Sequence, residues 1–204
     1  MITEFITACK NGNLYNILQL LAKTHIQIHF DHDYGFRLAC LYGHLHIVDY
    51  LVNLYTIKYD YNKIDIHAYS ELGFRWACQN GHIHIIEYLI NLYKIKNTNY
   101  GKININSNPN GNNSGFQFAC KHGHKHVVKY LNNLYKINMD YDKININIKS
   151  DSKLNTRWAF IHGHEYIIKY VINVYKYNHI FNPHIKYLSS CGNYLYDNKC
   201  IIVL

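Results

Sequence analysis

Histidine and cysteine recur together in this chain of 204 residues at spacings that could bind a metal ion. The motif Gly-His-x-His occurs three times, with a cysteine four residues before each first histidine: His44 and His46, His82 and His84, His124 and His126. Structural zinc needs four thiolate or imidazole ligands in a tetrahedron. A further copy has Phe160 at the cysteine position and Tyr166 at the second histidine position. We therefore expect packing and hydrogen-bonding roles for these residues, and no metal or other cofactor.

No catalytic motif accompanies the histidines. The sequence has no G-x-S-x-G elbow, no H-E-x-x-H and no G-x-x-x-x-G-K phosphate loop. Asp49 and Glu87 stand at equivalent positions on a predicted polar helix face, where carboxylates are solvated. A cysteine-dependent hydrolase would need one exposed thiol with a low pKa, whereas the Cys/His pair here recurs with the repeat. We therefore expect no enzymatic activity.

The histidine motif belongs to a block that recurs five times around a glycine. The blocks are FITACKNGNLYNI, FRLACLYGHLHIV, FRWACQNGHIHII, FQFACKHGHKHVV and TRWAFIHGHEYII, centred on Gly12, Gly43, Gly81, Gly123 and Gly163. One such unit cannot bury its apolar face alone, so neighbouring units must stack. The blocks predict one elongated domain running from Phe5 to about Tyr175.

Apolar spacing within a unit predicts two helices and an extended segment. Phe36, Ala39 and Cys40 follow helical spacing, and so do the apolar residues between Ile47 and Leu54 beyond the turn at Gly43. We expect a positive φ or a close helix approach at this glycine. Strict alternation follows in Ile64-Asp65-Ile66, in Ile103-Asn104-Ile105 and in residues 144–148, which predicts short extended segments.

Composition and cysteine usage indicate a folded intracellular protein. Hydrophobic residues make up 49% and charged residues 17% of the chain. Cys9, Cys40, Cys78 and Cys120 share one position in successive units, about one repeat apart, which is too far for disulfides. We expect buried free thiols in a reducing compartment. No apolar run reaches the roughly 20 residues that span a bilayer, and no signal peptide is recognisable, so we expect no membrane association.

Helix, glycine turn, helix and extended segment in this order resemble the ankyrin repeat, whose pattern is TPLHxAAxxGHxxIVxxLL followed by ADVN. Residues 39–44 match AAxxGH, Ile47-Val48 match IV, Leu51-Val52 match LL, and Ile64-Asp65-Ile66 stand where ADVN would. The resemblance implies that the first histidine of each Gly-His pair bonds backbone groups of the turn. It also implies an all-α solenoid of stacked helix-turn-helix repeats with short extended fingers.

The chain departs from the family pattern in two ways. Glycine replaces the proline of TPLH at Gly35, Gly73 and Gly115, which leaves the helix start less pre-organised. The turn glycines lie 31, 38, 42 and 40 residues apart, against a family period of about 33. The extra length sits in similar Tyr-rich inserts such as NLYTIKYDYNK and NLYKINMDYDK. Together with the richness in Ile, Asn, Lys and Tyr, this looks like the mimivirus-like ankyrin arrays of giant DNA viruses of amoebae.

We expect five repeats and a terminal segment. The repeats cover about residues 1–30, 31–68, 69–107, 108–149 and 150–177, and residues 178–204 form a degenerate sixth repeat or cap. The first block lacks the Gly-His pair, as an N-terminal capping unit would. Cys191 and Cys200 do not keep the register of the other cysteines.

Charge is distributed unevenly along the chain. The net charge is +8, but residues 1–93 hold 6 Lys and Arg against 8 Asp and Glu, whereas residues 94–204 hold 15 against 5. Lys121, Lys125 and Lys129 gather in one unit beside His122 and His126. Such a surface is either a lysine-rich face that is only solvated, or a surface that attracts an acidic protein or a nucleic acid.

The resemblance implies a non-catalytic scaffold that binds an unidentified protein partner, in the host cytoplasm if the chain is viral; the alternative is a nucleic-acid-binding protein using the basic second half. In the family, partners contact the finger tips and the two variable positions before Gly-His. Carried onto this chain, these positions are Phe30, Asp31, Asp33, Leu41, Tyr42, Tyr69, Glu71, Gln79, Asn80, Asn110, Asn112, Asn113, Lys121, His122, Ser150, Asp151, Lys153, Ile161 and His162. Their residue types change from unit to unit while the framework stays fixed.

Overall fold

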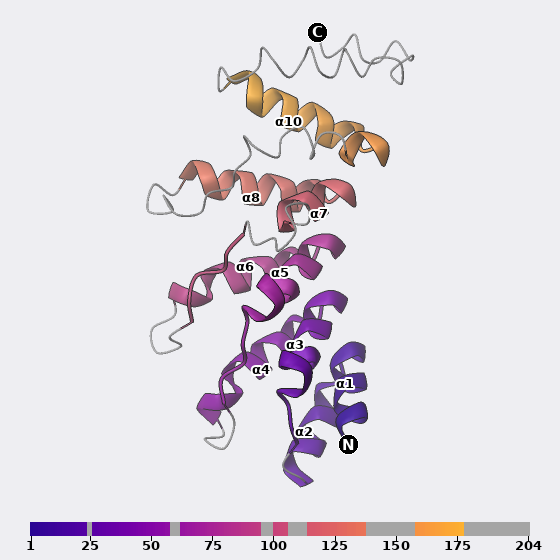
Figure 1. Ribbon diagram of the computed structural model, residues 1–204, viewed down its shortest axis with the longest axis vertical. Helices are drawn as coiled ribbons and strands as arrows, with labels where there is room; N and C mark the ends of the chain where they lie inside the picture. Colours follow the sequence, from indigo (N-terminus) through magenta and orange to yellow (C-terminus); the bar gives the residue numbers. More distant parts are fainter. Residues whose placement is uncertain (24–25, 58–61, 95–99, 106–113, 138–157, 178–204) are drawn as a thin grey trace.

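The chain forms a row of stacked helix pairs. The computed structural model describes residues 1–23, 26–57, 62–94, 100–105, 114–137 and 158–177. Its pairs are α1 (Ile2–Asn11) with α2 (Leu14–Lys23), α3 (Phe30–Tyr42) with α4 (Leu45–Ile57), α5 (Ala68–Asn80) with α6 (Ile83–Asn91), α7 (Gly115–Lys121) with α8 (Lys125–Ile137), and residues 158–161 with α10 (Glu165–Tyr177). A short 3-10 helix, η1 (Leu92–Lys94), extends α6. Figure 1 shows the pairs following one another along the long axis of the molecule.

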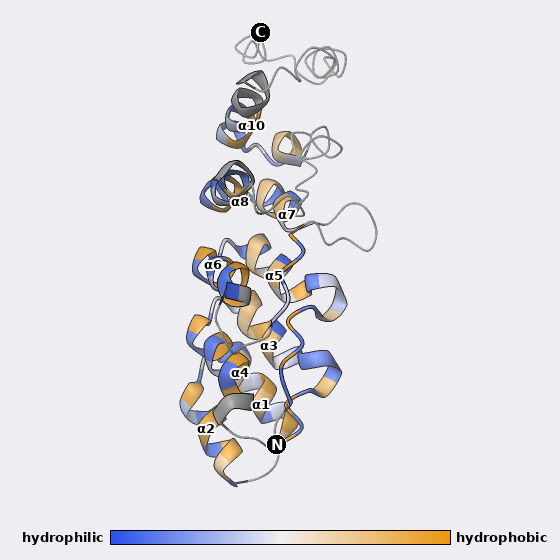
Figure 2. Cartoon of the chain, turned by 90° about the vertical axis from the view of Figure 1, so that its left-hand side faces the viewer, coloured by the Kyte–Doolittle hydropathy of each residue, from blue (hydrophilic) through white to orange (hydrophobic). Residues whose placement is uncertain are grey.

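First helices and second helices form separate layers. Figure 2 shows α1, α3, α5 and α7 in one column, and α2, α4, α6, α8 and α10 in the other. Within the first column, α1 packs on α3, α3 on α5, and α5 on α7. None of the residues that the structure describes lies in a β-strand. The prediction of an all-α solenoid of stacked repeats is confirmed.

The turn between the two helices of a pair depends on glycine. Gly81 has φ 76° and ψ 22°, and its N–H points to the carbonyls of Ala77 and Cys78. The other turn glycines, Gly12, Gly43, Gly123 and Gly163, also have φ between 70° and 84°. A Cβ is strained in this left-handed region, so glycine ends each first helix without cost. The predicted positive φ is confirmed.

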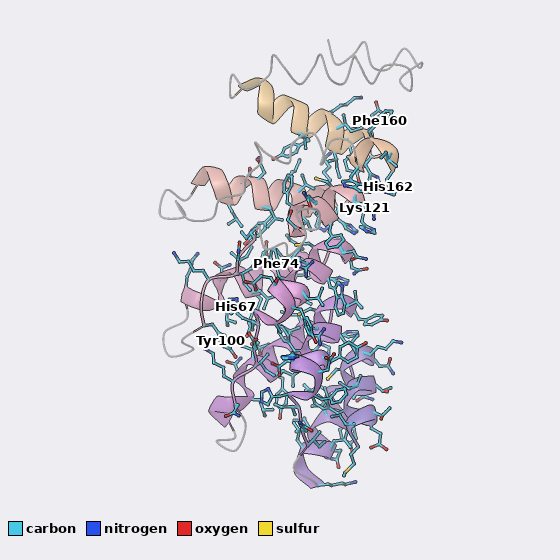
Figure 3. All side chains as sticks on the ribbon, in the orientation of Figure 1. His67, Phe74, Tyr100, Lys121, Phe160 and His162 are labelled. Atoms are coloured by element: carbon cyan, nitrogen blue, oxygen red, sulfur yellow. The ribbon has the colours of Figure 1, made fainter. Side chains whose placement is uncertain are left out.

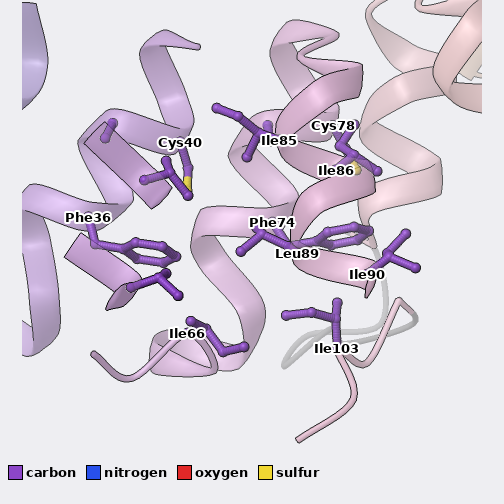
Figure 4. Packing of buried hydrophobic residues seen from close by; sticks show 14 of the residues in the cluster. Phe36, Cys40, Ile66, Phe74, Cys78, Ile85, Ile86, Leu89, Ile90 and Ile103 are labelled. Atoms are coloured by element: carbon purple, nitrogen blue, oxygen red, sulfur yellow. The ribbon is translucent and has the colours of Figure 1, made fainter. Parts of the chain in front are cut away.

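Phenylalanine, cysteine and glycine of neighbouring repeats form the centre of the core. Phe74 and Cys78 are fully buried on α5, and Figure 4 shows them beside Phe36 and Cys40 of the preceding repeat. A Cβ built on Gly115 would lie 2.7 Å from the Phe74 ring and 2.9 Å from Cys78 Sγ. Glycine thus stands where the family has proline because the ring and the thiol of the preceding repeat fill the space of a side chain.

The predicted extended segments keep their alternation without pairing as strands. Ile64 and Ile66 are buried while Asp65 between them is exposed, and Ile103 and Ile105 flank exposed Asn104 in the same way. Figure 4 shows Ile66 and Ile103 at the base of the Phe74 cluster. Each segment therefore covers the core between two repeats on the side that is lowest in Figure 4.

Parts of the sequence-based description remain predictions. The repeat boundaries are not fixed by the structure, and the 144–148 segment, the 178–204 segment, Cys191 and Cys200 lie outside the described residues. Within the described ranges, every helix is too short or too polar to span a bilayer.

Candidate partner-binding surface

The first histidine of each Gly-His pair joins its repeat to the one before. His82 Nε2 lies 2.9 Å from the Leu41 carbonyl, and His124 Nε2 lies 2.8 Å from the Gln79 carbonyl. His44 and His164 make the equivalent bonds to Lys10 and Lys121. Since a carbonyl only accepts, Nε2 must carry the proton and donate. The expected bond from histidine to backbone is present, but its acceptor lies near the end of the first helix of the preceding repeat and not in the histidine's own turn.

A second row of donors lies beside the first. His46 Nε2 donates to the Gly12 carbonyl and His126 Nε2 to the Gly81 carbonyl, each at 2.9 Å. In the last pair, Tyr166 donates its hydroxyl to the Gly123 carbonyl. A tyrosine can replace histidine in this role, whereas it would not preserve a zinc site of the usual ligands. No cluster of three or more metal-binding side chains occurs among the described residues.

The described cysteines lack the properties of a nucleophile. Cys9, Cys40, Cys78 and Cys120 are free and buried. Burial raises the pKa of the Cys9 thiol to about 12, and burial also raises the pKa of Cys40, Cys78 and Cys120. A hydrolase would need an exposed thiol with a lowered pKa, which these four positions do not offer.

The finger tips of the second and third repeats are left-handed turns. Asp31, His32 and Asp33 have φ of 46°, 50° and 62°, and residues 69–71 repeat this conformation. Non-glycine residues in this region cost about 1–2 kcal/mol each, so other contacts must stabilise the turn. The buried guanidinium of Arg37 provides them, because Nε donates to the His32 carbonyl at 3.2 Å and Nη2 donates to the Asp31 carbonyl.

The third repeat has the same hydrogen bonds from an arginine to the turn carbonyls, whereas the fourth has a glutamine at this position. Arg75 donates from Nε to the Ser70 carbonyl and from Nη2 to the Tyr69 carbonyl, both at 2.9 Å. The equivalent residue of the fourth repeat is Gln117, which forms a capping box with Ser114 at the start of α7. The residue at this position thus contacts the start of the first helix in all three repeats, through carbonyls of the left-handed turn where it is arginine and through Ser114 where it is glutamine.

Two predicted surface residues, Asp33 and Glu71, are buried instead. They are 3% and 5% exposed. Asp33 accepts from His29 Nδ1 at 2.6 Å and from the Asp65 N–H of the extended segment that follows α4 at 2.8 Å. Glu71 accepts from His67 Nδ1 at 2.8 Å and from Asn104 N–H at 3.1 Å. The expected exposure of these two side chains is not found, because the left-handed turn points each carboxylate at the backbone of the following finger.

The remaining finger-tip residues form a polar and aromatic patch. Phe30 and Tyr69 are 46% and 50% exposed. The Tyr69 hydroxyl donates to Asp31 Oδ1 at 3.0 Å, and its ring lies 4.6 Å from the Arg37 guanidinium carbon. The hydrogen bonds from Arg37 and Tyr69 lower the pKa of Asp31. The patch therefore joins the second and third repeats through Tyr69.

The variable positions before each turn glycine lie on the surface. Tyr42, Asn80, His122 and His162 are exposed, while the preceding residues Leu41, Gln79 and Lys121 are half-buried and Ile161 is exposed. Asn110, Asn112, Asn113, Ser150, Asp151 and Lys153 lie outside the described residues. The described members therefore form two short rows along the ends of the first helices.

Sequence reasoning missed an aromatic row beside these positions. Trp76, Phe118 and Trp158 share one register position and are half-buried. The Trp158 ring stacks on His162 with centroids 5.9 Å apart, and Lys121 Nζ lies 4.9 Å from the centre of the same ring. The signal was present, because each of these aromatics stands two residues before the cysteine position of its block.

The stacked helix pairs, the left-handed glycine turns and the histidine bonds between successive units define a class of protein, the helical repeat solenoid. The family model for ankyrin repeats (three copies) matches residues 5–100, 37–143 and 74–182. Because these matches cover most of the sequence, the chain belongs to the ankyrin-repeat family. The comparison with curated proteins gives no match.

Proposed function

We propose that this protein is a non-catalytic scaffold that binds another protein through the exposed residues at the ends of its first helices and at its finger tips. One observation carries the proposal. The residue before the turn glycine is exposed in all five repeats, yet it is Asn11, Tyr42, Asn80, His122 and His162 in turn. The glycine itself never changes, and the alanine and cysteine behind it are buried wherever they occur.

This contrast supports binding because the residues that stabilise the fold stay constant, whereas the exposed residues that a partner would contact vary. Ankyrin repeats are known for binding proteins, and solenoids present extended surfaces. Exposed aromatic residues are frequent interface anchors, and Tyr42 and Tyr69 are 45% and 50% exposed. An origin in a giant DNA virus of amoebae, with a host partner, extends this proposal and rests on composition and insert pattern.

Affinity capture with matched variants tests the proposal. Tyr42→Ala or Tyr69→Ala should weaken capture of specific proteins by about tenfold or more, since truncating an anchor costs about 2 kcal/mol. Tyr15→Ala is the control, because Tyr15 is 69% exposed on α2, a second helix. Unchanged capture by both test variants would refute the proposal.

The alternative of nucleic-acid binding rests on the basic second half of the chain. In that case nuclease treatment would abolish capture, and affinity for duplex DNA would fall with salt at a log–log slope of about −0.9 per neutralised phosphate. Lys121→Ala would then reduce the slope by about 1. For the favoured protein partner, Tyr42→Ala and Tyr69→Ala weaken capture at every salt concentration.

A further inference from the structure

Cationic and aromatic side chains meet at the junction of the fourth and fifth repeats. Figure 3 shows Lys121 and His162 next to one another, with Phe160 beyond them. Lys121 Nζ lies 4.9 Å from the centre of the Trp158 ring, His162 stacks on the same ring, and Phe118 lies 6.4 Å from His122. We call Phe118, Lys121, His122, Trp158 and His162 the junction surface.

The junction surface has positive neighbours and little negative charge. In residues 114–137 and 158–177, the acidic side chain is Glu165, which pairs with Lys169 at 2.7 Å. Burial lowers the pKa of His122, and Lys121, His162 and other neighbouring histidines lower it further. The lowered pKa means that the protonated form of His122 is disfavoured beside Lys121, and an approaching anion would favour that form and interact with Lys121 as well.

The corresponding positions in the earlier repeats have different chemistry. They are Leu41 and Tyr42 in the second repeat, and Gln79 and Asn80 in the third. In the first repeat, Lys10 Nζ lies 5.5 Å from the Tyr42 ring centre, but residues 1–93 hold more acidic than basic residues. At the positions before the turn glycines of the second to fourth repeats, the lysine is therefore Lys121 of the junction surface.

The arrangement fits a carboxylate-bearing peptide better than a nucleic acid. Binding of single strands relies on aromatic faces that are free to stack on bases, whereas the Trp158 ring already carries His162 and Lys121. Lys125 and Lys129 lie on α8, over Tyr166 and Tyr170 of α10, so they do not extend the row of Lys121. A single carboxylate needs one such cation, and the half-buried rings of Phe118 and Trp158 offer apolar contact beside it.

Resting on the scaffold function proposed above, we propose that the junction surface binds an acidic segment of a partner protein. The acidic side chain contacts Lys121 and the exposed histidines, and an adjoining apolar side chain packs beside Trp158. The charge of the second half of the chain then attracts the partner, and the aromatic row holds it.

The test is selection of a random displayed peptide library on the full chain, followed by fluorescence anisotropy with the selected peptides. Two charge reversals are compared, Lys121→Glu and the control Lys10→Glu, which alters the same register position of the first repeat. Lys121→Met removes the charge but keeps an unbranched side chain at this position, and thermal unfolding checks that each variant folds. An oligothymidylate strand is the nucleic-acid probe.

Peptides enriched in Asp and Glu are expected, with affinity lost by about tenfold or more in Lys121→Glu and changed by less than about twofold in Lys10→Glu. Lys121→Met should also bind these peptides more weakly than wild type. Selected peptides without acidic enrichment, or acidic peptides that bind Lys121→Glu and wild type equally, would overturn this inference and leave the scaffold function intact. Absence of any selected peptide would overturn this inference, while the scaffold function is tested by the capture experiment with Tyr42→Ala and Tyr69→Ala. Tighter binding of oligothymidylate than of every peptide, weakened in Lys121→Glu, would replace the acidic segment by nucleic acid.

Discussion

Replacing Gly81 by alanine tests how one repeat is joined to the next. The added Cβ would lie 2.5 Å from His124 Nδ1, closer than side chains tolerate, so the imidazole would have to move. Alanine at φ 76° costs about 1–2 kcal/mol. Moving the ring also breaks the 2.8 Å bond from His124 Nε2 to the Gln79 carbonyl, which contributes about 1 kcal/mol. Gly81→Ala should therefore lower the free energy of unfolding by about 2–3 kcal/mol.

A double-mutant cycle separates the two costs. In a His124→Ala background the clash and the bond are already absent, so Gly81→Ala should cost only the backbone term of about 1–2 kcal/mol. The coupling energy is then about 1 kcal/mol. Urea titration followed by circular dichroism measures all four proteins, and their m-values show whether the array still unfolds as one unit.

Gly163→Ala is the internal control for the backbone term. Gly163 has φ 71°, but no described atom lies within 4 Å of a Cβ built there. It should therefore show the backbone cost alone. If Gly81→Ala and His124→Ala are additive to within about 0.5 kcal/mol, the contact between the turn glycine and the next histidine does not stabilise the array.

Three further outcomes follow from the structure. Thiol reagents should modify Cys40 and Cys78 far more slowly in the native protein than in urea, since both are fully buried with a raised pKa, and fast native labelling would contradict that packing. Arg37→Gln should lower the free energy of unfolding by about 1–3 kcal/mol, because the left-handed turn loses its donors; an unchanged urea midpoint would show that the turn does not need the guanidinium. The pKa of His67 is raised, chiefly by its bond to Glu71, so its stabilisation is full below the unfolded pKa of about 6.5 and is lost as the pH rises through the folded value. The urea midpoint of wild type minus that of His67→Gln should accordingly be larger at about pH 5.5 than at about pH 8. A difference that is smaller at about pH 5.5 would show that the charged His67–Glu71 pair does not stabilise the fold.

The framework of the fold could be predicted because it depends on local patterns that recur. Helical spacing of Phe36, Ala39 and Cys40 requires only a buried stripe, and Gly43 requires only a left-handed turn. The buried cysteines followed from the same register. Each of these features depends on residues within one block of sequence. Its recurrence in successive blocks therefore made the pattern recognisable.

The finger tips could not be predicted, because their conformation depends on contacts between distant positions. Asp and His enter the left-handed region more readily than most non-glycine residues, but as single residues, so no local preference predicts three in a row at Asp31, His32 and Asp33. Arg37 stabilises that turn from within the helix, and the Asp65 N–H, 32 residues further along the chain, donates to the Asp33 carboxylate. Burial of Asp33 and Glu71 follows from these contacts, and the predicted exposure failed at those two positions for this reason.

The direction of the histidine bonds has a consequence for how the protein is made. Every histidine of the row from His44 to His164 donates to a carbonyl of the preceding repeat. Asn13, at the first position of this row, instead accepts from the Asn16 N–H at the start of its own helix. A ribosome releases the chain from the N-terminus, so each repeat emerges with its donors facing an acceptor surface that already exists. Co-translational assembly can therefore proceed one repeat at a time, and no newly made repeat has to wait for a later one to complete its histidine bond.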